Sequence, residues 1–506
     1  MSVTHERLKE IPEFYSTPSM PNGISSDGNF ETNIINVMFA GNPIENQQFI
    51  AFINSNASAI LFPLNDTIES IGPKSTWDDT QQELEKYNVA NRLHDQGRYN
   101  EAEKIYWESL KIFPTPAAFV NLAHLSLIRQ KFEDAELFSR RAIKTTKVTI
   151  TDGLFRNEFG VFANAYLNLG TALERQGKLE EAKAALRKSI VINPNVAITY
   201  IDLGEILLSQ NRLTETEDVY HKAIAAHINN AEIYFSLGNL LVNQNRMNEA
   251  ENAWRNAIAA DANYAPAYCS LGVLLTNQNH LKEAEKYYYK AIEADPNYAL
   301  TYSNLGIFLE SQNRLREAEN AYRKALALGA GVDIYVSLGN LLASQNRWKE
   351  AEDIYQKAIV IAPNNIKAYV NLGVLFSKQN RIHEAVNAYQ KAIGVDPNNA
   401  TVLSHLGVLF YSQDRLKEAE NSWREAIVAD SNYVQAYLNL GVLLANQNRM
   451  KEAENVYRNA IAADPNYAEV YFNLGVLLEN QNRLKEANAL FAKALQIDPS
   501  LERFLK

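Results

Sequence analysis

Apolar, small and polar positions recur along most of the chain with a period of 34 residues. Ten glycines mark this period, each directly after a leucine, and only the step from Gly306 to Gly339 is shorter, at 33 residues. A large apolar residue lies sixteen positions after every glycine, and alanine lies twelve positions after nine of the ten. These offsets predict two amphipathic helices per repeat. The glycines are Gly170, Gly204, Gly238, Gly272, Gly306, Gly339, Gly373, Gly407, Gly441 and Gly475.

The small and large positions predict how the two helices of a repeat pack. Small residues opposite large aromatic ones let helices approach closely, so we expect each glycine to face the large residue of the second helix. Tyrosine stands four residues before nine of the glycines, and we expect it to pack between the helices. The link between the helices repeatedly reads Gln-Asn-Arg, and its Asn suits the left-handed backbone that ends many helices.

This combination of period, Tyr, Leu-Gly and paired alanines resembles the tetratricopeptide repeat family. Two weaker repeats, around Ala90 and Ala123, precede the ten regular ones, so the resemblance covers about residues 80–499. The resemblance implies an all-α fold, a right-handed α-solenoid superhelix of about 12 helix pairs. The concave wall of such a superhelix is formed by the first helix of each pair.

The repeat register divides the chain into segments. We expect two divergent repeats over 80–144, an insertion that lengthens a loop over 145–162, ten regular repeats over 163–499, and a partial C-terminal capping helix over 500–506. Thr80 and Glu83 form a Thr-x-x-Glu capping box, which predicts the start of the first helix.

Residues 1–79 differ from the rest in composition, with three basic and ten acidic residues. Residues 33–40 and 57–64 read as short strands and 44–53 as a helix between them, which predicts an acidic arm and a small appended domain of mixed α/β structure. Two roles remain open for it, a docking or regulatory element and a cover for the exposed end of the solenoid.

Overall composition excludes several classes of protein. A formal net charge of −10 and a pI of about 5.5 argue against a nucleic-acid partner. No stretch of roughly 18 apolar residues is present, so no membrane span is expected. Charged residues near the N-terminus do not fit a signal peptide, and Cys269 is the single cysteine, so we expect a cytoplasmic protein.

The sequence offers no constellation for catalysis or for a metal. The five histidines of the regular repeats occupy five different offsets, so they do not line one face as a metal site requires. Ser404 and His405 have no evident acidic partner for a catalytic triad. We therefore expect no enzyme activity, no catalytic residue and no cofactor.

Polar residues stand two positions before every glycine, and five of these ten residues are asparagine. Amides donate and accept hydrogen bonds, so such a row can hold an extended peptide backbone; it is similar to the asparagine ladder in the tetratricopeptide arm of O-GlcNAc transferase, without that enzyme's catalytic domain. The position after the glycine adds two more amides and a row of valine and isoleucine. The expected partner-binding residues on the concave face are Asn168, Asn239, Asn304, Asn340, Asn371, His405, Asn439 and Asn473.

The function predicted from these features is a non-catalytic scaffold that binds a protein or peptide segment along the concave groove. A targeting or regulatory subunit of an enzyme whose chemistry lies on a partner chain is the alternative. A groove that is merely hydrated would carry the same polar row. Self-association through the ends of the solenoid also stays open.

Overall fold

The computed structural model describes residues 77–112, 114–151 and 158–504. These residues form 24 α-helices and no strand, so the predicted all-α solenoid of about 12 helix pairs is confirmed. The predicted strands and helix within residues 1–79 lie outside the described residues. We call the first helix of each pair the A helix and the second the B helix.

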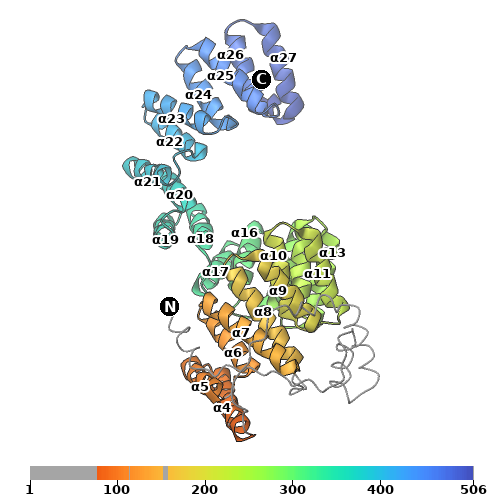
Figure 1. The fold of residues 1–506 in the computed structure, drawn as a ribbon. Coiled ribbons are helices and arrows are strands. Elements are labelled where there is room, and N and C mark those ends of the chain that lie inside the picture. The colour runs from red at the N-terminus through yellow and green to blue at the C-terminus, as the bar shows by residue number, and fades with distance from the viewer. Residues whose placement is uncertain (1–76, 113, 152–157, 505–506) are drawn as a thin grey trace. The chain divides into compact units, whose positions relative to one another are not determined.

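The chain divides into two compact parts, Met1–Leu271 and Gly272–Lys506, and the boundary falls within α14 (Ala265–Asn277). In each part, successive helices run side by side as A and B helices of a stack (Figure 1). The helices of the first part are α4 (Trp77–Asp95), α5 (Tyr99–Ile112), α6 (Pro116–Ile128), α7 (Phe132–Thr151), α8 (Glu158–Arg175), α9 (Leu179–Ile192), α10 (Ala197–Ser209), α11 (Leu213–Ala225), α12 (Ala231–Asn243) and α13 (Met247–Ala260).

The second part continues the same alternation of A and B helices. Its last element is a short 3-10 helix, η1 (Pro499–Phe504). The helices are α15 (Leu281–Ala294), α16 (Ala299–Ser311), α17 (Leu315–Ala327), α18 (Val332–Ser344), α19 (Trp348–Ile361), α20 (Ile366–Lys378), α21 (Ile382–Val395), α22 (Ala400–Ser412), α23 (Leu416–Ala429), α24 (Val434–Asn446), α25 (Met450–Ala463), α26 (Ala468–Asn480) and α27 (Leu484–Ile497).

In the ten regular repeats, the glycine of the A helix faces the large side chain of the B helix, as predicted. A methyl group added at Gly306 would lie 2.5 Å from two ring atoms of Tyr322, whose side chain is fully buried. The same relationship holds at Gly204 and Tyr220. Glycine is therefore required by the closeness of the two helices and not by the local backbone.

The tyrosines four residues before the glycine are less uniform than predicted. Tyr200 is buried, whereas Tyr302 is half-buried and its hydroxyl donates to the backbone oxygen of Pro296 over 3.2 Å. Tyr302 thus packs at the edge of the helix pair, and its hydroxyl helps to hold the turn that precedes α16. The fully buried ring of this pair is Tyr322.

The Asn between the two helices of a repeat adopts the left-handed backbone that the sequence predicted. Its φ angle lies between 57° and 62° in eight repeats, and Asp414 takes the same conformation at 59°. The residues concerned are Asn211, Asn245, Asn279, Asn313, Asn346, Asn380, Asn448 and Asn482.

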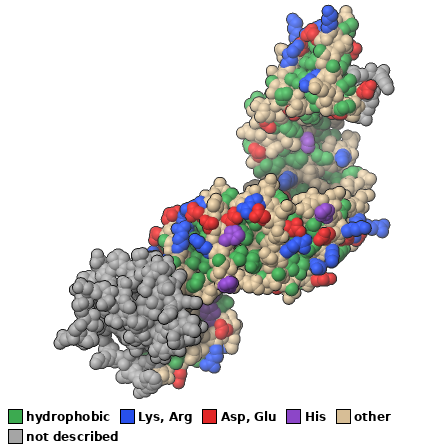
Figure 2. Space-filling model, turned by 90° about the vertical axis from the view of Figure 1, so that its right-hand side faces the viewer, with side chains coloured by type: hydrophobic (Ala, Val, Ile, Leu, Met, Phe, Trp, Pro, Cys, Tyr) green, Lys and Arg blue, Asp and Glu red, His purple; other side chains and the backbone are tan. Residues whose placement is uncertain are grey.

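Arginine and glutamate side chains join neighbouring helix pairs along the outside of each stack. Arg483 Nη1 lies 2.7 Å from Glu454 Oε2 of the preceding B helix, and Arg483 also pairs with Glu486 of its own helix. Hydrogen bonds from Arg483 hold the pKa of Glu454 below its usual range. Equivalent bridges join Arg314 to Glu285 and Arg246 to Glu217. On the face drawn in Figure 2, positive and negative side chains accordingly lie next to one another.

The capping box predicted at Thr80 is wrong. Helix α4 begins at Trp77, three residues earlier, and Glu83 is buried at 5% exposure. Its carboxylate accepts hydrogen bonds from Ser109 Oγ at 2.8 Å and Thr115 Oγ1 at 3.0 Å. Glu83 therefore ties α4 to α5 and to the start of α6, because the tertiary contacts satisfy the carboxylate better than a local cap does.

Two of the expected segment boundaries can be compared with the helices. The segment expected as a loop over 145–162 is helical up to Thr151, where α7 ends, and again from Glu158, where α8 begins; residues 152–157 lie outside the described residues. At the other end, η1 takes the place of the expected capping helix. Its Leu501 is buried against Tyr471 and Ala494 and covers the end of the last pair.

Candidate functional site

The amides that the repeat pattern predicted stand on the A helices. In each part of the chain, we call the surface formed by these helices the A-helix face. It comprises the positions two before and one after each glycine. Asn304, Asn371, Asn439 and Asn473 are half-buried. Asn239 and Asn340 are exposed.

Asn168 does not fit this face. It is 7% exposed, and its side-chain nitrogen donates to the backbone oxygen of Val120 over 3.1 Å. The amide therefore joins α8 to α6 inside the stack, and it is not available to a partner.

His405 is the one residue of the expected binding set that is not an asparagine. Its ring lies edge-on to Tyr389, with centroids 6.0 Å apart, and its Nδ1 atom is buried with no hydrogen-bond partner among the described residues. Burial lowers the pKa of this imidazole. A neutral ring of this kind interrupts the amide row between Asn371 and Asn439.

Asn340, Tyr355 and Asn371 form a hydrogen-bonded group that we call the central amide cluster. The Tyr355 hydroxyl donates to Asn340 Oδ1 over 2.6 Å, and Asn371 Nδ2 donates to the same oxygen over 2.8 Å. Tyr355 is buried, so its hydroxyl holds the Asn340 oxygen toward the helix pair. The Asn340 amide is thereby fixed in one orientation.

This orientation leaves one donor and one acceptor unused. Among the described residues, nothing is hydrogen-bonded to Asn340 Nδ2 or to Asn371 Oδ1. A peptide group offers one carbonyl acceptor and one N–H donor, so an extended backbone can continue the cluster at both atoms. The central amide cluster is therefore equipped to bind backbone without selecting side chains.

Aliphatic side chains alternate with the amides on the A-helix face of the second part. The exposed fractions are 52% for Ile307, 47% for Val408 and 39% for Val442, and Val273 and Val476 are exposed to 36%. Single exposed aliphatic residues are common on protein surfaces, but here they recur at the same offset, directly after the glycine, in five repeats. They provide apolar contacts beside the hydrogen-bonding groups.

A second group, which the sequence analysis missed, lies in the first two helix pairs. Tyr106 Oη donates to Asn91 Oδ1 over 2.7 Å, and Asn121 Nδ2 donates to the same oxygen over 2.8 Å. We call these residues the N-terminal amide cluster. Ala90 and Ala123 stand where the regular repeats have glycine, so Asn91 and Asn121 occupy the same offsets as Asn340 and Asn371. That alignment was the signal that could have revealed them.

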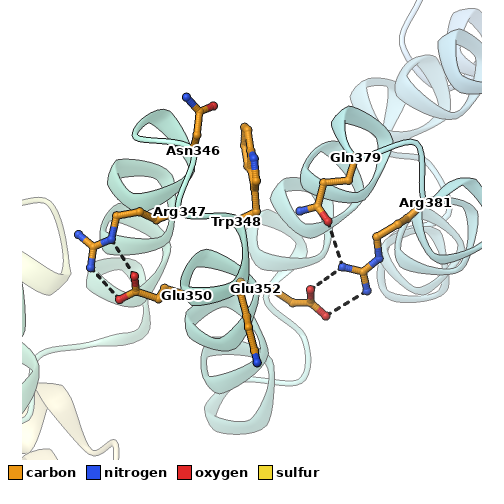
Figure 3. A pocket seen from close by; sticks show the side chains of 8 residues that line it. Asn346, Arg347, Trp348, Glu350, Glu352, Gln379 and Arg381 are labelled. Atoms are coloured by element: carbon orange, nitrogen blue, oxygen red, sulfur yellow. Dashed lines mark hydrogen bonds and ion pairs between the residues drawn. The ribbon is translucent and has the colours of Figure 1, made fainter.

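The described residues also line a pocket of about 580 Å³ beside the links between helices in the second part. Trp348 stands at its edge, with Arg347 paired to Glu350 and Arg381 paired to Glu352 and Gln379 (Figure 3). The Arg381–Glu352 pair is of the kind that joins neighbouring helix pairs elsewhere, and Arg347 and Glu350 pair within one repeat. The pocket is therefore built from structural bridges.

Two other kinds of feature are absent from the part of the chain that the structure describes. No group of three or more His, Cys, Asp or Glu side chains is placed to hold a metal ion. None of the described helices is both long and apolar enough to cross a membrane. Cys269 is buried.

The glycine–aromatic helix pairs with their left-handed Asn links define a tetratricopeptide-repeat protein. The model of the family described as the Cilia and flagella-associated protein 70 C-terminal domain matches twice, over residues 85–300 and 301–503. The chain belongs to this family.

Solved structures are similar to the chain at low identity. YrrB, described as a TPR protein with an unusual peptide-binding site, is 24% identical; the match covers 37% of this chain and 96% of YrrB, with a TM-score of 0.31. MamA is 22% identical over 33% of this chain and 97% of its own, at 0.29. The APC/C hetero-tetramer Cut9-Hcn1 is 13% identical over 78% and 96%, at 0.38. No curated protein matches the chain significantly.

Proposed function

We propose that the protein is a non-catalytic scaffold that binds an extended segment of a partner protein along its A-helix face. One observation carries this proposal. Asn340 and Asn371 are held in fixed orientations by Tyr355 and by each other, with a donor and an acceptor left over. Groups prepared in this way lose little conformational freedom when a peptide backbone binds.

The neighbouring residues supply the rest of the binding surface. Asn304, Asn439 and Asn473 present further amides in other repeats, and exposed aliphatic residues such as Val442 lie between them. Backbone hydrogen bonds would fix the position of the bound segment along the face, and the aliphatic row would provide apolar contacts. We further infer that the partner is a cytoplasmic protein. The description of the family points to the cilium or flagellum as one place where the two proteins would meet.

The test uses the full chain and a peptide selected on it by phage display. The variant replaces Asn304, Asn371, Asn439 and Asn473 with Ala. Each lost hydrogen bond contributes only about 0.5–1.5 kcal/mol, so the four together are expected to weaken binding by about 100-fold or more. The melting profile should stay the same, because none of the four side chains is buried.

A matched control replaces four exposed asparagines on B helices with Ala: Asn320, Asn387, Asn421 and Asn455. This control changes the same chemistry on a different face, and it should leave the affinity of the peptide unchanged. Equal affinity of the A-helix variant and the wild type would overturn the proposed function.

A further inference from the structure

The N-terminal amide cluster repeats the two hydrogen bonds that define the central cluster. In both, a buried tyrosine hydroxyl and the second Asn donate to the oxygen of the first Asn, at 2.7 and 2.8 Å in one and 2.6 and 2.8 Å in the other. Among the described residues, nothing is hydrogen-bonded to Asn91 Nδ2 or to Asn121 Oδ1. The same donor and the same acceptor are therefore unused.

The surroundings of the two clusters differ. Asn121 Nδ2 also donates to Tyr106 Oη over 3.0 Å and to Tyr87 Oη over 3.2 Å, and Val336 stands at the offset of Tyr87 beside the central cluster. His94 and His124 stand beside the N-terminal cluster, at the repeat offsets that Ala343 and Val374 occupy beside the central one. His94 Nε2 lies 3.2 Å from His124 Nδ1, and His94 Nδ1 lies 3.4 Å from Tyr106 Oη. The hydrogen-bond network of the cluster thus extends through two imidazoles onto the surface, since His124 is exposed.

Both imidazoles are suited to neutral hydrogen bonding. Desolvation lowers the pKa of His94, and the neighbouring His124 lowers it further; partial desolvation of the ring also lowers the pKa of His124, although the residue as a whole is exposed. A neutral imidazole has one donor and one acceptor nitrogen. The methyl groups of Ala343 and Val374 offer neither, so the two clusters present different chemistry to a side chain next to a bound backbone.

We propose that the N-terminal amide cluster is a second peptide-binding site, which holds an extended backbone at Asn91 and Asn121 and a hydrogen-bonding side chain of the same segment at His94 and His124. The inference rests on the proposed function, because it assigns to this cluster the backbone binding argued for the central one. It adds a site in the first part of the chain and a preference for polar side chains there.

The experiment first disrupts the central cluster by removing Asn371 together with the other half-buried amides of the second part. Peptides are selected by phage display on the full chain that carries the four Ala substitutions of the A-helix variant. Their affinities are then measured after a further Asn91→Asp substitution. Aspartate keeps an oxygen that accepts from Tyr106 and Asn121, but it replaces the unused N–H donor with a second oxygen. Asn256→Asp, at an exposed position on α13, is the matched control for the added charge.

We expect the selection to recover peptides. Asn91→Asp should weaken their binding by about 10-fold or more, and Asn256→Asp should leave it unchanged. Asn121→Ala should weaken them by about 3- to 10-fold. Replacing His94 with Ala and His124 with Val should shift the selected sequences from polar to aliphatic side chains. Recovery of no peptide, or of peptides indifferent to both Asn91→Asp and Asn121→Ala, would overturn the inference.

Failure of the proposed function would give a different experimental result from failure of this inference. Peptides that are selected on the wild type and are insensitive to Asn91→Asp would then also be insensitive to the four Ala substitutions in the second part. Peptides sensitive to Asn91→Asp would still support the N-terminal site in that case.

Discussion

The side-chain nitrogen of Asn371 donates to Asn340 Oδ1 over 2.8 Å, and this bond joins the A helices of two successive repeats. The two residues lie 31 positions apart, one after the glycine of the first repeat and two before the glycine of the next. A regular repeat therefore places hydrogen-bonding side chains of adjacent helices side by side. This bond holds the two amides in fixed orientations, as the proposed binding of a peptide backbone requires.

Gly306→Ala is expected to destabilise the second part by about 1–3 kcal/mol. The added methyl group would lie 2.5 Å from the Tyr322 ring, and such overpacking outweighs the roughly 0.5–1 kcal/mol that alanine contributes over glycine within a helix. Gly394→Ala, in α21, is the control, because nothing lies within 4 Å of its added methyl group. Denaturant unfolding should show a loss for the first variant and no loss for the second.

Tyr322→Ala should cost about 3–5 kcal/mol, whereas Tyr302→Ala should cost clearly less. Tyr322 is fully buried between α16 and α17, and its removal leaves a cavity. Tyr302 is half-buried and loses mainly one hydrogen bond to Pro296. Hydrogen-exchange protection of α16 and α17 measures the local loss, and equal effects of the two changes would contradict the assigned packing.

Asp202→Asn is expected to stabilise the first part at pH 7.5 by roughly 1–2 kcal/mol. Burial raises the pKa of Asp202 to about 6, against an ordinary value of 3.8, so the ionised carboxylate disfavours the fold above pH 6. The free energy of unfolding of the wild type should rise as the pH falls from about 6 to about 4. The difference in stability between the variant and the wild type should therefore shrink over that range. Thermal melts against pH measure this. Asp218→Asn, at an exposed position on α11, should show no such pH-dependent gain.

The sequence predicted those parts of the fold that depend on local spacing. Gly306 and Tyr322 are sixteen residues apart in a helical hairpin, so their contact follows from the period alone. The left-handed backbone at Asn346 follows from the chemistry of a single residue. Such features need no knowledge of distant parts of the chain.

Features that depend on distant contacts were harder to predict. Glu83 has the spacing of a capping box, yet its partners Ser109 and Thr115 lie 26 and 32 residues away. Asn168 fits the repeat pattern, but its acceptor Val120 lies 48 residues earlier, across the insertion, where the regular register does not apply. Asn91 and Asn121 escaped notice because alanine replaces the marker glycine in both of their repeats.

The central claim is that amides of the A-helix face hold the backbone of a bound segment. The most direct measurement is the affinity of a phage-selected peptide for the full chain after N-methylation of its backbone, one amide at a time. N-methylation removes an N–H donor and keeps every side chain. Methylation of the peptide group that donates to Asn371 Oδ1 should therefore lower the affinity by about 10-fold. Methylation at the ends of the peptide should have no effect. Unchanged affinity at every position would contradict the account, because the peptide would then be held by its side chains alone.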